Sequence, residues 1–285
     1  MGRNLLARVL VAAVAIPAIL WIAYRGGFWL VGLIGLLALI AISEFLINEG
    51  FGPRSGLFWL GFTATAVLII VNGNVGRLVP TTTEAGMWSA TTLTVVVVMS
   101  FFTVTAITFA IGKVPPAELF QRHSRLLWGI IYVGLLYPIV LRVGQGVGGH
   151  SGGDALLFLF GVLWVGDTAA MAAGTWLGKH RLAPEVSPRK TVEGLIGGLL
   201  GGVAVGLFMY FWKFHSLGLT RVLLLALGCS FFGQMGDLVE SMWKRSLGIK
   251  DSSRIIPGHG GVLDRFDSLL FAAPFMYAFF YFVHS

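Results

Sequence analysis

The stretch from Ser241 to Asp267 concentrates chemically capable side chains in a chain that is otherwise strongly apolar. It holds nine ionisable residues, His259 included, within 27 positions. Carboxylate oxygens are the ligands that a hard divalent cation prefers, and Lys and Arg side chains neutralise phosphate groups. We therefore expect the chemistry of this protein to take place in this stretch.

Acidic residues inside the apolar runs are a second indication of a site. Asp167 lies in one run, Asp237 and Glu240 close another, and Asp264 and Asp267 open the last. A charged side chain at the centre of a membrane span costs about 2.5–3.5 kcal/mol on insertion scales. Such a cost indicates a functional reason for these acids.

The polar residues around Asp237 predict one polar face on a helix. Steps of three and four residues stay on one side of a helix, because each residue advances by about 100°. The residues on this face are Ser230, Gln234, Asp237, Ser241 and Lys244. Glu240 falls about 40° beyond the edge of this polar face. Asp264, Asp267 and Ser268 share a face of the following helix.

Carboxylates that converge from two helices suit Mg²⁺, which takes oxygen ligands and keeps sites for water and substrate phosphate. The alternative is structural and stays open at this point. Asp237 could pair with Lys244, and Asp264 with Arg265, as local salt bridges.

Basic residues and glycines accompany these acids. The bases are Lys190, Lys244, Arg245, Lys250, Arg254 and Arg265, together with His259. The segment Pro257–Gly261 leads into the last apolar run, where glycines let the backbone approach a ligand and free N–H groups favour an anion. This loop predicts a phosphate cradle beside a metal site, an arrangement that phosphoryl or nucleotidyl transfer needs.

The segment from Gly178 to Gly194 repeats the combination of bases and helix start. Pro188 is expected near the start of a helix, with Ser187 as its N-cap and Glu193 in its first turns. For Ser187 and Glu193, capping and substrate contact are equally open. Arg189 and Lys190 at the positive end of that helix favour an anion.

The composition predicts an integral membrane protein. Hydrophobic residues make up 56% of the 285 residues and charged residues only 12%, far from the soluble average. A single cysteine excludes an intrachain disulfide and a cysteine-rich metal cluster. The net charge of +7 comes from short loops between apolar runs, so the expected partners are the lipid bilayer and a small phosphate-bearing molecule, with no nucleic acid.

Apolar runs of about 20 residues predict an all-α fold with about nine membrane spans. The expected spans are about 5–24, 28–48, 57–73, 90–112, 126–144, 154–174, 193–213, 220–240 and 263–283. The first run is too long for a signal-peptide core and lacks a cleavage site, so it is kept as a span. The expected regions are N-terminal spans in 1–120 and a catalytic region in 121–285 with loops 175–192 and 241–262.

The distribution of Lys and Arg predicts the orientation in the membrane. The even-numbered connections between spans hold twelve cations and the odd-numbered ones hold five. The positive-inside rule then places the even connections and the N-terminus in the cytoplasm. The stretch from Ser241 to Asp267 is expected to face the cytoplasm.

Two regions resemble the phosphatidate cytidylyltransferases, also called CDP-diacylglycerol synthases. Residues 241–267 match the pattern of Ser, two residues, Lys-Arg, then Lys-Asp, and finally Pro-x-His-Gly-Gly-x-x-Asp-Arg-x-Asp. An upstream part of the chain resembles a second region of that family, at Gly166–Ala170, Gly174, Gly178 and 187–194. Three positions depart from the family pattern, namely Trp243, Met171 and Arg189. The resemblance is strong over about residues 160–270.

The resemblance implies a Mg²⁺-dependent enzyme of phospholipid biosynthesis that joins CTP to phosphatidate, giving CDP-diacylglycerol and pyrophosphate. The acids in the spans are consistent with this: we expect Asp237 and Asp264 to hold the metal, with Asp267 and Asp167 as closer or outer support. The catalytic residues that the resemblance implies are Asp237, Lys244, Asp264 and Arg265. The substrate-binding residues it implies are Ser187, Lys190, Thr191, Arg245, Lys250, His259, Gly260 and Gly261. It also implies a multi-pass protein of the inner or plasma membrane with its site facing the cytoplasm; a second cation and a homodimer are left open.

Two rival functions remain at the level of sequence. A CTP-dependent polyprenol kinase would transfer the γ-phosphoryl group of CTP and release CDP instead of pyrophosphate. A transporter or channel would also carry carboxylates in its spans. Against a transporter, the charges cluster at the cytoplasmic end of a few predicted helices, and no inverted repeat is visible.

Overall fold

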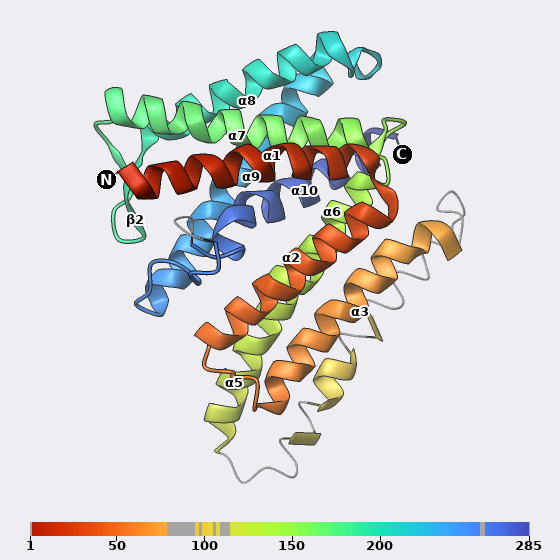
Figure 1. Cartoon of the computed structure of the whole chain (residues 1–285), viewed down its shortest axis with the longest axis vertical. Coiled ribbons are helices and arrows are strands. Elements are labelled where there is room, and N and C mark those ends of the chain that lie inside the picture. Colours follow the sequence, from red (N-terminus) through yellow and green to blue (C-terminus); the bar gives the residue numbers. More distant parts are fainter. Residues whose placement is uncertain are drawn as a thin grey trace. The chain divides into compact units, whose positions relative to one another are not determined.

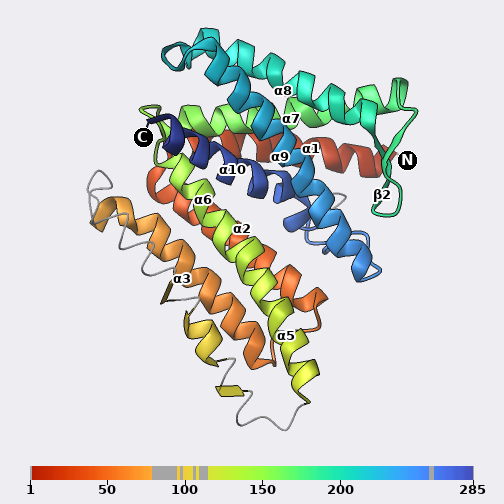
Figure 2. The ribbon, with the colours of Figure 1, turned by 180° about the vertical axis from the view of Figure 1, so that it is seen from behind.

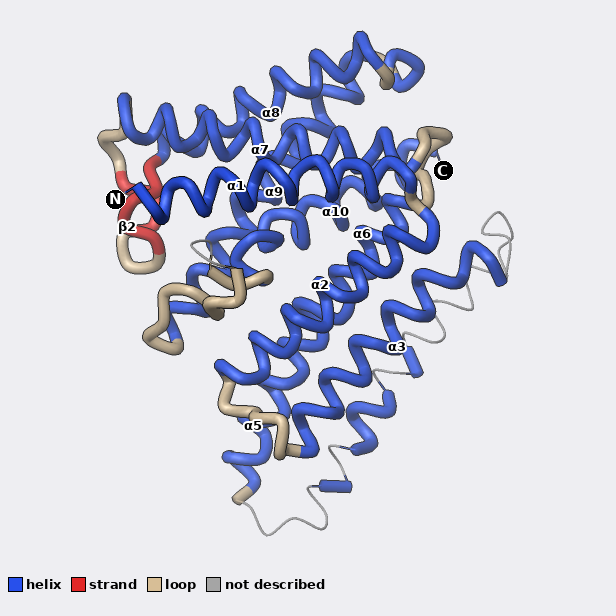
Figure 3. The backbone as a smooth tube through the Cα atoms, viewed as in Figure 1, coloured by secondary structure: helices blue, strands red, loops and turns tan. Residues whose placement is uncertain are grey.

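The computed structural model describes residues 2–78, 95–96, 99–104, 107–108, 115–256 and 260–284, with side chains described from residue 13 except at 74–78 and 284 (Figure 1). In these ranges the chain is almost entirely helical, and its two short strands form one hairpin (Figure 3). Seven helical segments of the described part are long and apolar enough to cross a membrane. The all-α, polytopic membrane fold is therefore confirmed.

Most of the predicted spans correspond to helices of the structure. The first falls within α1 (Gly2–Arg25), and the fourth, 90–112, lies largely outside the described residues. The others match α2 (Gly27–Asn48), α3 (Gly56–Leu78), the run α5–η1–α6 (Pro116–Gly144), α7 (Gly152–Trp176), α8 (Val192–Trp212), α9 (Leu219–Ser246) and α10 (Leu263–His284). The cytoplasmic N-terminus and the division at residue 120 stay predictions.

Residues Val31–Leu141 form one compact unit. It contains most of α2, all of α3, and a continuous helical run of α5 (Pro116–Gly129), the π-helical segment η1 (Ile130–Leu135) and the start of α6 (Leu136–Gly144). Helices α2 and α5 approach closely at Gly129, where a Cβ atom would lie 2.6 Å from Phe45 Cδ1. A glycine is therefore required at this crossing.

Residues Met1–Leu30 and Arg142–Ser285 form the second compact unit, which carries the acids and bases singled out above. Within it α8 packs along α7, and α9 lies against both α8 and α10 (Figure 2). Small residues allow the first of these contacts. A Cβ atom on Gly197 would lie 2.4 Å from Ala173 Cβ, and one on Gly201 would lie 2.7 Å from Ala169 Cβ.

The segment between α7 and α8 corrects the predicted helix start. Ser187–Thr191 is strand β2, which pairs antiparallel with β1 (Arg181–Ala183), and α8 begins only at Val192. Pro188 therefore lies in a strand of a two-stranded hairpin. Each strand of such a hairpin has one edge that pairs with no other strand, so a residue without an N–H group is tolerated there. Ser187 does not cap the helix, because Thr191 is the N-cap residue.

Candidate active site

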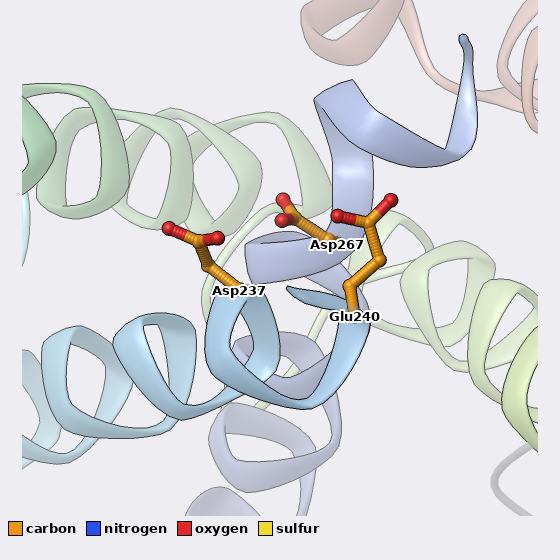
Figure 4. A group of neighbouring side chains, drawn as sticks. All are labelled: Asp237, Glu240 and Asp267. Atoms are coloured by element: carbon orange, nitrogen blue, oxygen red, sulfur yellow. The ribbon is translucent and has the colours of Figure 1, made fainter. Parts of the chain in front are cut away.

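Three carboxylates gather where α9 meets the first turn of α10 (Figure 4). One oxygen from each of Asp237, Glu240 and Asp267 lies within 4.8 Å of the other two. Asp237 and Glu240 are one helical turn apart on α9, and Asp267 comes from α10. We call these three residues the carboxylate cluster.

A glycine on α9 allows the two helices to bring these acids together. A Cβ atom on Gly236 would lie only 2.6 Å from the backbone oxygen of Asp267. The close approach leaves Glu240 fully buried and Asp267 with 7% of its surface exposed. Carboxylates this close and this buried repel one another unless a cation or a donor lies between them or one of them is protonated.

Donors satisfy only part of the carboxylate cluster. Lys190 Nζ lies 2.6 Å from Asp237 Oδ2, and the Ser268 backbone N–H donates to Asp267 Oδ1 at 2.7 Å. Lys244 Nζ donates to Glu240 Oε2 at 2.5 Å. Glu240 Oε1 is buried and accepts no hydrogen bond from any residue that the structure describes. This incompletely paired, oxygen-rich group fits a hard divalent cation.

Asp264 lies beside the cluster with both of its oxygens engaged. Oδ1 accepts from Lys244 Nζ at 2.8 Å, so Lys244 bridges α9 and α10. Oδ2 accepts from the N–H groups of Ser252 at 2.9 Å and Gly261 at 2.8 Å, and from Ser252 Oγ at 3.1 Å. Asp264 thus ties both ends of the loop between the two helices to the start of α10.

Two neighbouring cavities meet at Asp167 and Asp237. The first, the acidic cavity, has a volume of about 410 Å³. Its charged lining residues are Asp167, Asp237, Glu240, Lys244, Asp251, Asp264, Arg265 and Asp267. The second, the basic cavity, has a volume of about 720 Å³. Its charged lining residues are Asp167, Asp237, Arg181, Arg189 and Lys190.

The hairpin that carries the bases of the basic cavity is held at both of its ends. Glu193, in the first turn of α8, accepts from the backbone N–H groups of Lys179 at 3.1 Å and His180 at 3.2 Å. His180 Nδ1 also lies 2.6 Å from Glu193 Oε1. At the turn of the hairpin, Arg245 Nε donates to the Val186 carbonyl at 3.3 Å. Glu193 and Arg245 therefore position the hairpin between α7 and α9.

Thr191 makes a capping contact in the structure. Its Oγ1 accepts from the Gly194 N–H at 3.0 Å, and only 5% of the residue is exposed. We expect Thr191→Val, which keeps the shape but loses the acceptor, to lower the free energy of unfolding by about 1 kcal/mol. Thr191→Ser should retain most of the stability of the wild-type protein. Denaturation in detergent followed by tryptophan fluorescence measures both. A Val variant of unchanged stability with a raised KM would instead assign Thr191 to substrate binding.

The structure brings many of the predicted site residues together around the two cavities. These are Asp167, Lys190, Thr191, Asp237, Lys244, Asp264, Arg265 and Asp267. Four of the predicted residues line neither of these two cavities, namely Ser187, Arg245, Lys250 and Gly260. The backbone N–H of Gly261 donates to Asp264. His259 lies outside the described residues. The roles predicted for all these residues stay predictions.

The local pairs offered as the structural alternative are replaced by contacts between elements. Asp237 pairs with Lys190 of the hairpin, and Asp264 pairs with Lys244 of α9. Sequence reasoning left Glu240 out of the site, because it falls outside the polar stripe of α9. Its spacing of three residues from Asp237 and four from Lys244 was the signal that could have included it.

The fold is that of a polytopic membrane protein, and its site combines a carboxylate cluster that fits a divalent cation with a basic hairpin. A family model described as the cytidylyltransferase family matches residues 6–283, and the chain belongs to this family. A protein named phosphatidate cytidylyltransferase from Staphylococcus haemolyticus is 37% identical over 94% of this chain and 96% of its own length. Proteins of the same name from Staphylococcus saprophyticus and Staphylococcus aureus are 35% and 34% identical, with the same two coverages.

Proposed function

We propose that this protein joins CTP to phosphatidate, forming CDP-diacylglycerol and releasing pyrophosphate. The observation that carries the proposal is the contact between Lys190 of the basic hairpin and Asp237 of the carboxylate cluster, at 2.6 Å. This contact supports the proposal, because it sets a base suited to phosphate beside a candidate cation site in a chain of the cytidylyltransferase family. The names of the relatives supply the lipid substrate.

The reaction needs no nucleophile from the protein. An oxygen of the lipid phosphate forms a bond to the α-phosphorus of CTP, and the bond from that phosphorus to the oxygen bridging to the β-phosphate breaks. The lipid oxygen is anionic at neutral pH, so no base is required to activate it. The protein's task is to position two anions against each other and to stabilise the charge on the departing pyrophosphate.

We assign the carboxylate cluster, with Asp167 at the junction of the cavities, to holding a divalent cation, for which Mg²⁺ suits the all-oxygen set. The buried and unpaired oxygen of Glu240 supports this assignment. A cation bound there would offset the negative charge of the triphosphate and polarise its P–O bonds. Asp264 remains in the proposal as the residue that orders the loop before α10 and holds Lys244 in place.

The bases around the two cavities would bind the phosphates. Lys244 and Arg265 line the acidic cavity and are assigned to the triphosphate and the leaving pyrophosphate. Lys190 stands at the junction, within reach of the group that is transferred. The remaining predicted contacts, Ser187, Arg245, Lys250, His259, Gly260 and Gly261, stay part of the proposal as support from the loops.

We further propose that the site opens to the cytoplasm of the cell and that the protein resides in its inner or plasma membrane. The excess of Lys and Arg in the even-numbered connections supports this orientation. CTP would then arrive from the cytoplasm, while the lipid reaches the site from within the bilayer.

Purified protein, assayed with phosphatidate and CTP labelled at either the α- or the γ-phosphate, tests this function. We expect α-label in the lipid product and γ-label in pyrophosphate, in equal amounts. Label in the lipid from γ-labelled CTP, with release of CDP, would identify a kinase and overturn the proposal.

A further inference from the structure

We propose that the two cavities divide the substrates, with the basic cavity taking the phosphomonoester head of the lipid and Arg181 determining selectivity for it. This inference rests on the proposed function for the identity of the lipid. Arg181 lies outside the residues that carried the family resemblance, and it lines the basic cavity.

The charges of the two cavities favour different ligands. Six carboxylates and only two bases line the acidic cavity, and one of those bases, Lys244, is already paired with both Glu240 and Asp264. A bare phosphate is repelled there, so its occupant must arrive with a divalent cation, as a nucleoside triphosphate does. Three bases and two carboxylates line the basic cavity, and Lys190 is paired with Asp237, so Arg181 and Arg189 are the bases that can accept a phosphate there without a metal.

The apolar surroundings of the basic cavity suit a lipid. Ala170, Met171, Leu182 and Leu195 form part of its lining. Met171 is 69% exposed on the membrane-spanning helix α7, and Trp176 at the end of that helix is 82% exposed. The exposed Met171 belongs to the cavity wall, so acyl chains can lie along this apolar wall while the head remains on the hairpin.

Arg181 lines the basic cavity from the hairpin and has donors suited to the head group. Its Nη1 donates to the Pro188 carbonyl across the hairpin at 2.6 Å, which tethers the guanidinium to the hairpin. Only one of five N–H donors is used by that bond, and a planar fork matches two oxygens of a phosphate. A phosphomonoester carries a charge of about −1.5 to −2 at neutral pH, whereas a phosphodiester carries about −1, so this arginine favours the monoester.

The competing occupant of the basic cavity is the triphosphate of CTP, which presents the same phosphate chemistry. The two are separated by measuring KM for each substrate with the other saturating. For Arg181→Gln we expect KM for dioctanoyl phosphatidate to rise by about 10- to 100-fold and KM for CTP to stay within about twofold. Arg181→Lys, which keeps the charge but loses the fork, should raise KM for phosphatidate by a smaller factor.

The matched control is Lys179→Gln, which removes one positive charge from the exposed segment before the hairpin and lines neither cavity. It should leave both KM values unchanged. Thermal unfolding followed by tryptophan fluorescence verifies that the Arg181 variants fold; if Arg181→Gln does not, Arg181→Lys carries the test. A rise in KM for CTP, alone or with that for phosphatidate, overturns the division of substrates, as does no change in either.

Calorimetric titration of dioctanoyl phosphatidate into detergent-solubilised protein without CTP tests the inference independently of turnover. The affinity should fall by a similar factor in Arg181→Gln, whereas the affinity for CTP with Mg²⁺ should be retained. An unchanged affinity for phosphatidate overturns the inference. If the wild-type protein binds phosphatidate through Arg181 but releases CDP in the labelling assay, the proposed function fails while this binding site stands.

Discussion

Replacing Asp237 by Asn is expected to lower kcat/KM for cytidylyl transfer by about 10³-fold. Asp237 is the residue at which the two cavities, the carboxylate cluster and the hairpin lysine come together. The amide removes one negative charge from the candidate cation site and the ion pair with Lys190. The variant should also need a higher Mg²⁺ concentration for half-maximal activity.

The measurement is a Mg²⁺ titration of turnover with Asp237→Asn and a matched control. Glu185→Gln is the control, because this exposed residue of the hairpin turn loses the same charge and lines neither of the two cavities. Both variants should keep the unfolding midpoint within a few degrees of the wild type. Wild-type turnover in folded Asp237→Asn would refute the assignment of the cation site.

Replacing Lys244 by Gln is expected to destabilise the protein by about 3–5 kcal/mol, besides removing its activity. The side chains of Lys244, Glu240 and Asp264 are 12%, 1% and 4% exposed, so the neutral amide leaves these acids without their ammonium partner in a mostly buried place. Glu240 would then be left buried without its Lys244 donor, close to Asp237 and Asp267. Asp264 would keep three of its four donors.

Combining Lys244→Gln with Glu240→Gln should recover at least half of the lost stability, because the second change removes the uncompensated buried charge. Activity should not return, since the lysine and one cluster oxygen are both absent. Denaturation in detergent at constant pH measures the stabilities, with the exposed Arg254→Gln as control. A single Lys244 variant as stable as the wild type would contradict this expectation. A double variant less stable than the single variant would contradict it as well.

The polar face of α9 shows how far helical spacing alone predicts the site. The expected stripe of Ser230, Gln234, Asp237, Ser241 and Lys244 corresponds to a row of contacts toward the site and α8. Ser230 donates to the Gly198 carbonyl at 3.0 Å, and Ser241 donates to Asp237 at 3.3 Å. Positions within one helix are set by its repeat, so their grouping can be read without any tertiary information.

Glu240 marks the limit of that reasoning. It lies outside the stripe, yet the close approach of α10 at Gly236 places Asp267 beside it. Whether a side chain at the edge of a polar face joins a site depends on which helix covers that edge. Spacing within α9 contains no information about the position of α10.

The hairpin between α7 and α8 is the other feature that sequence reasoning misjudged. A strand of five residues, Ser187–Thr191, has a proline and two bases and shows no hydrophobic alternation. It pairs with a three-residue strand, so neither strand carries a recognisable pattern of its own. The same proline that suggested a helix start is tolerated in the hairpin, and local sequence does not distinguish the two settings.

The sequence by itself determined the membrane fold, the phase of each polar helix face, and the residue types needed for metal-assisted chemistry on phosphates. Composition, periodicity and charge are properties of a single segment. They can therefore be read without knowing which other segments pack against it. The tertiary structure decided that Lys190 pairs with Asp237 and that Lys244 lies between Glu240 and Asp264. Those pairings depend on distances between elements far apart in the chain, which glycine-mediated packing of α7, α8, α9 and α10 sets.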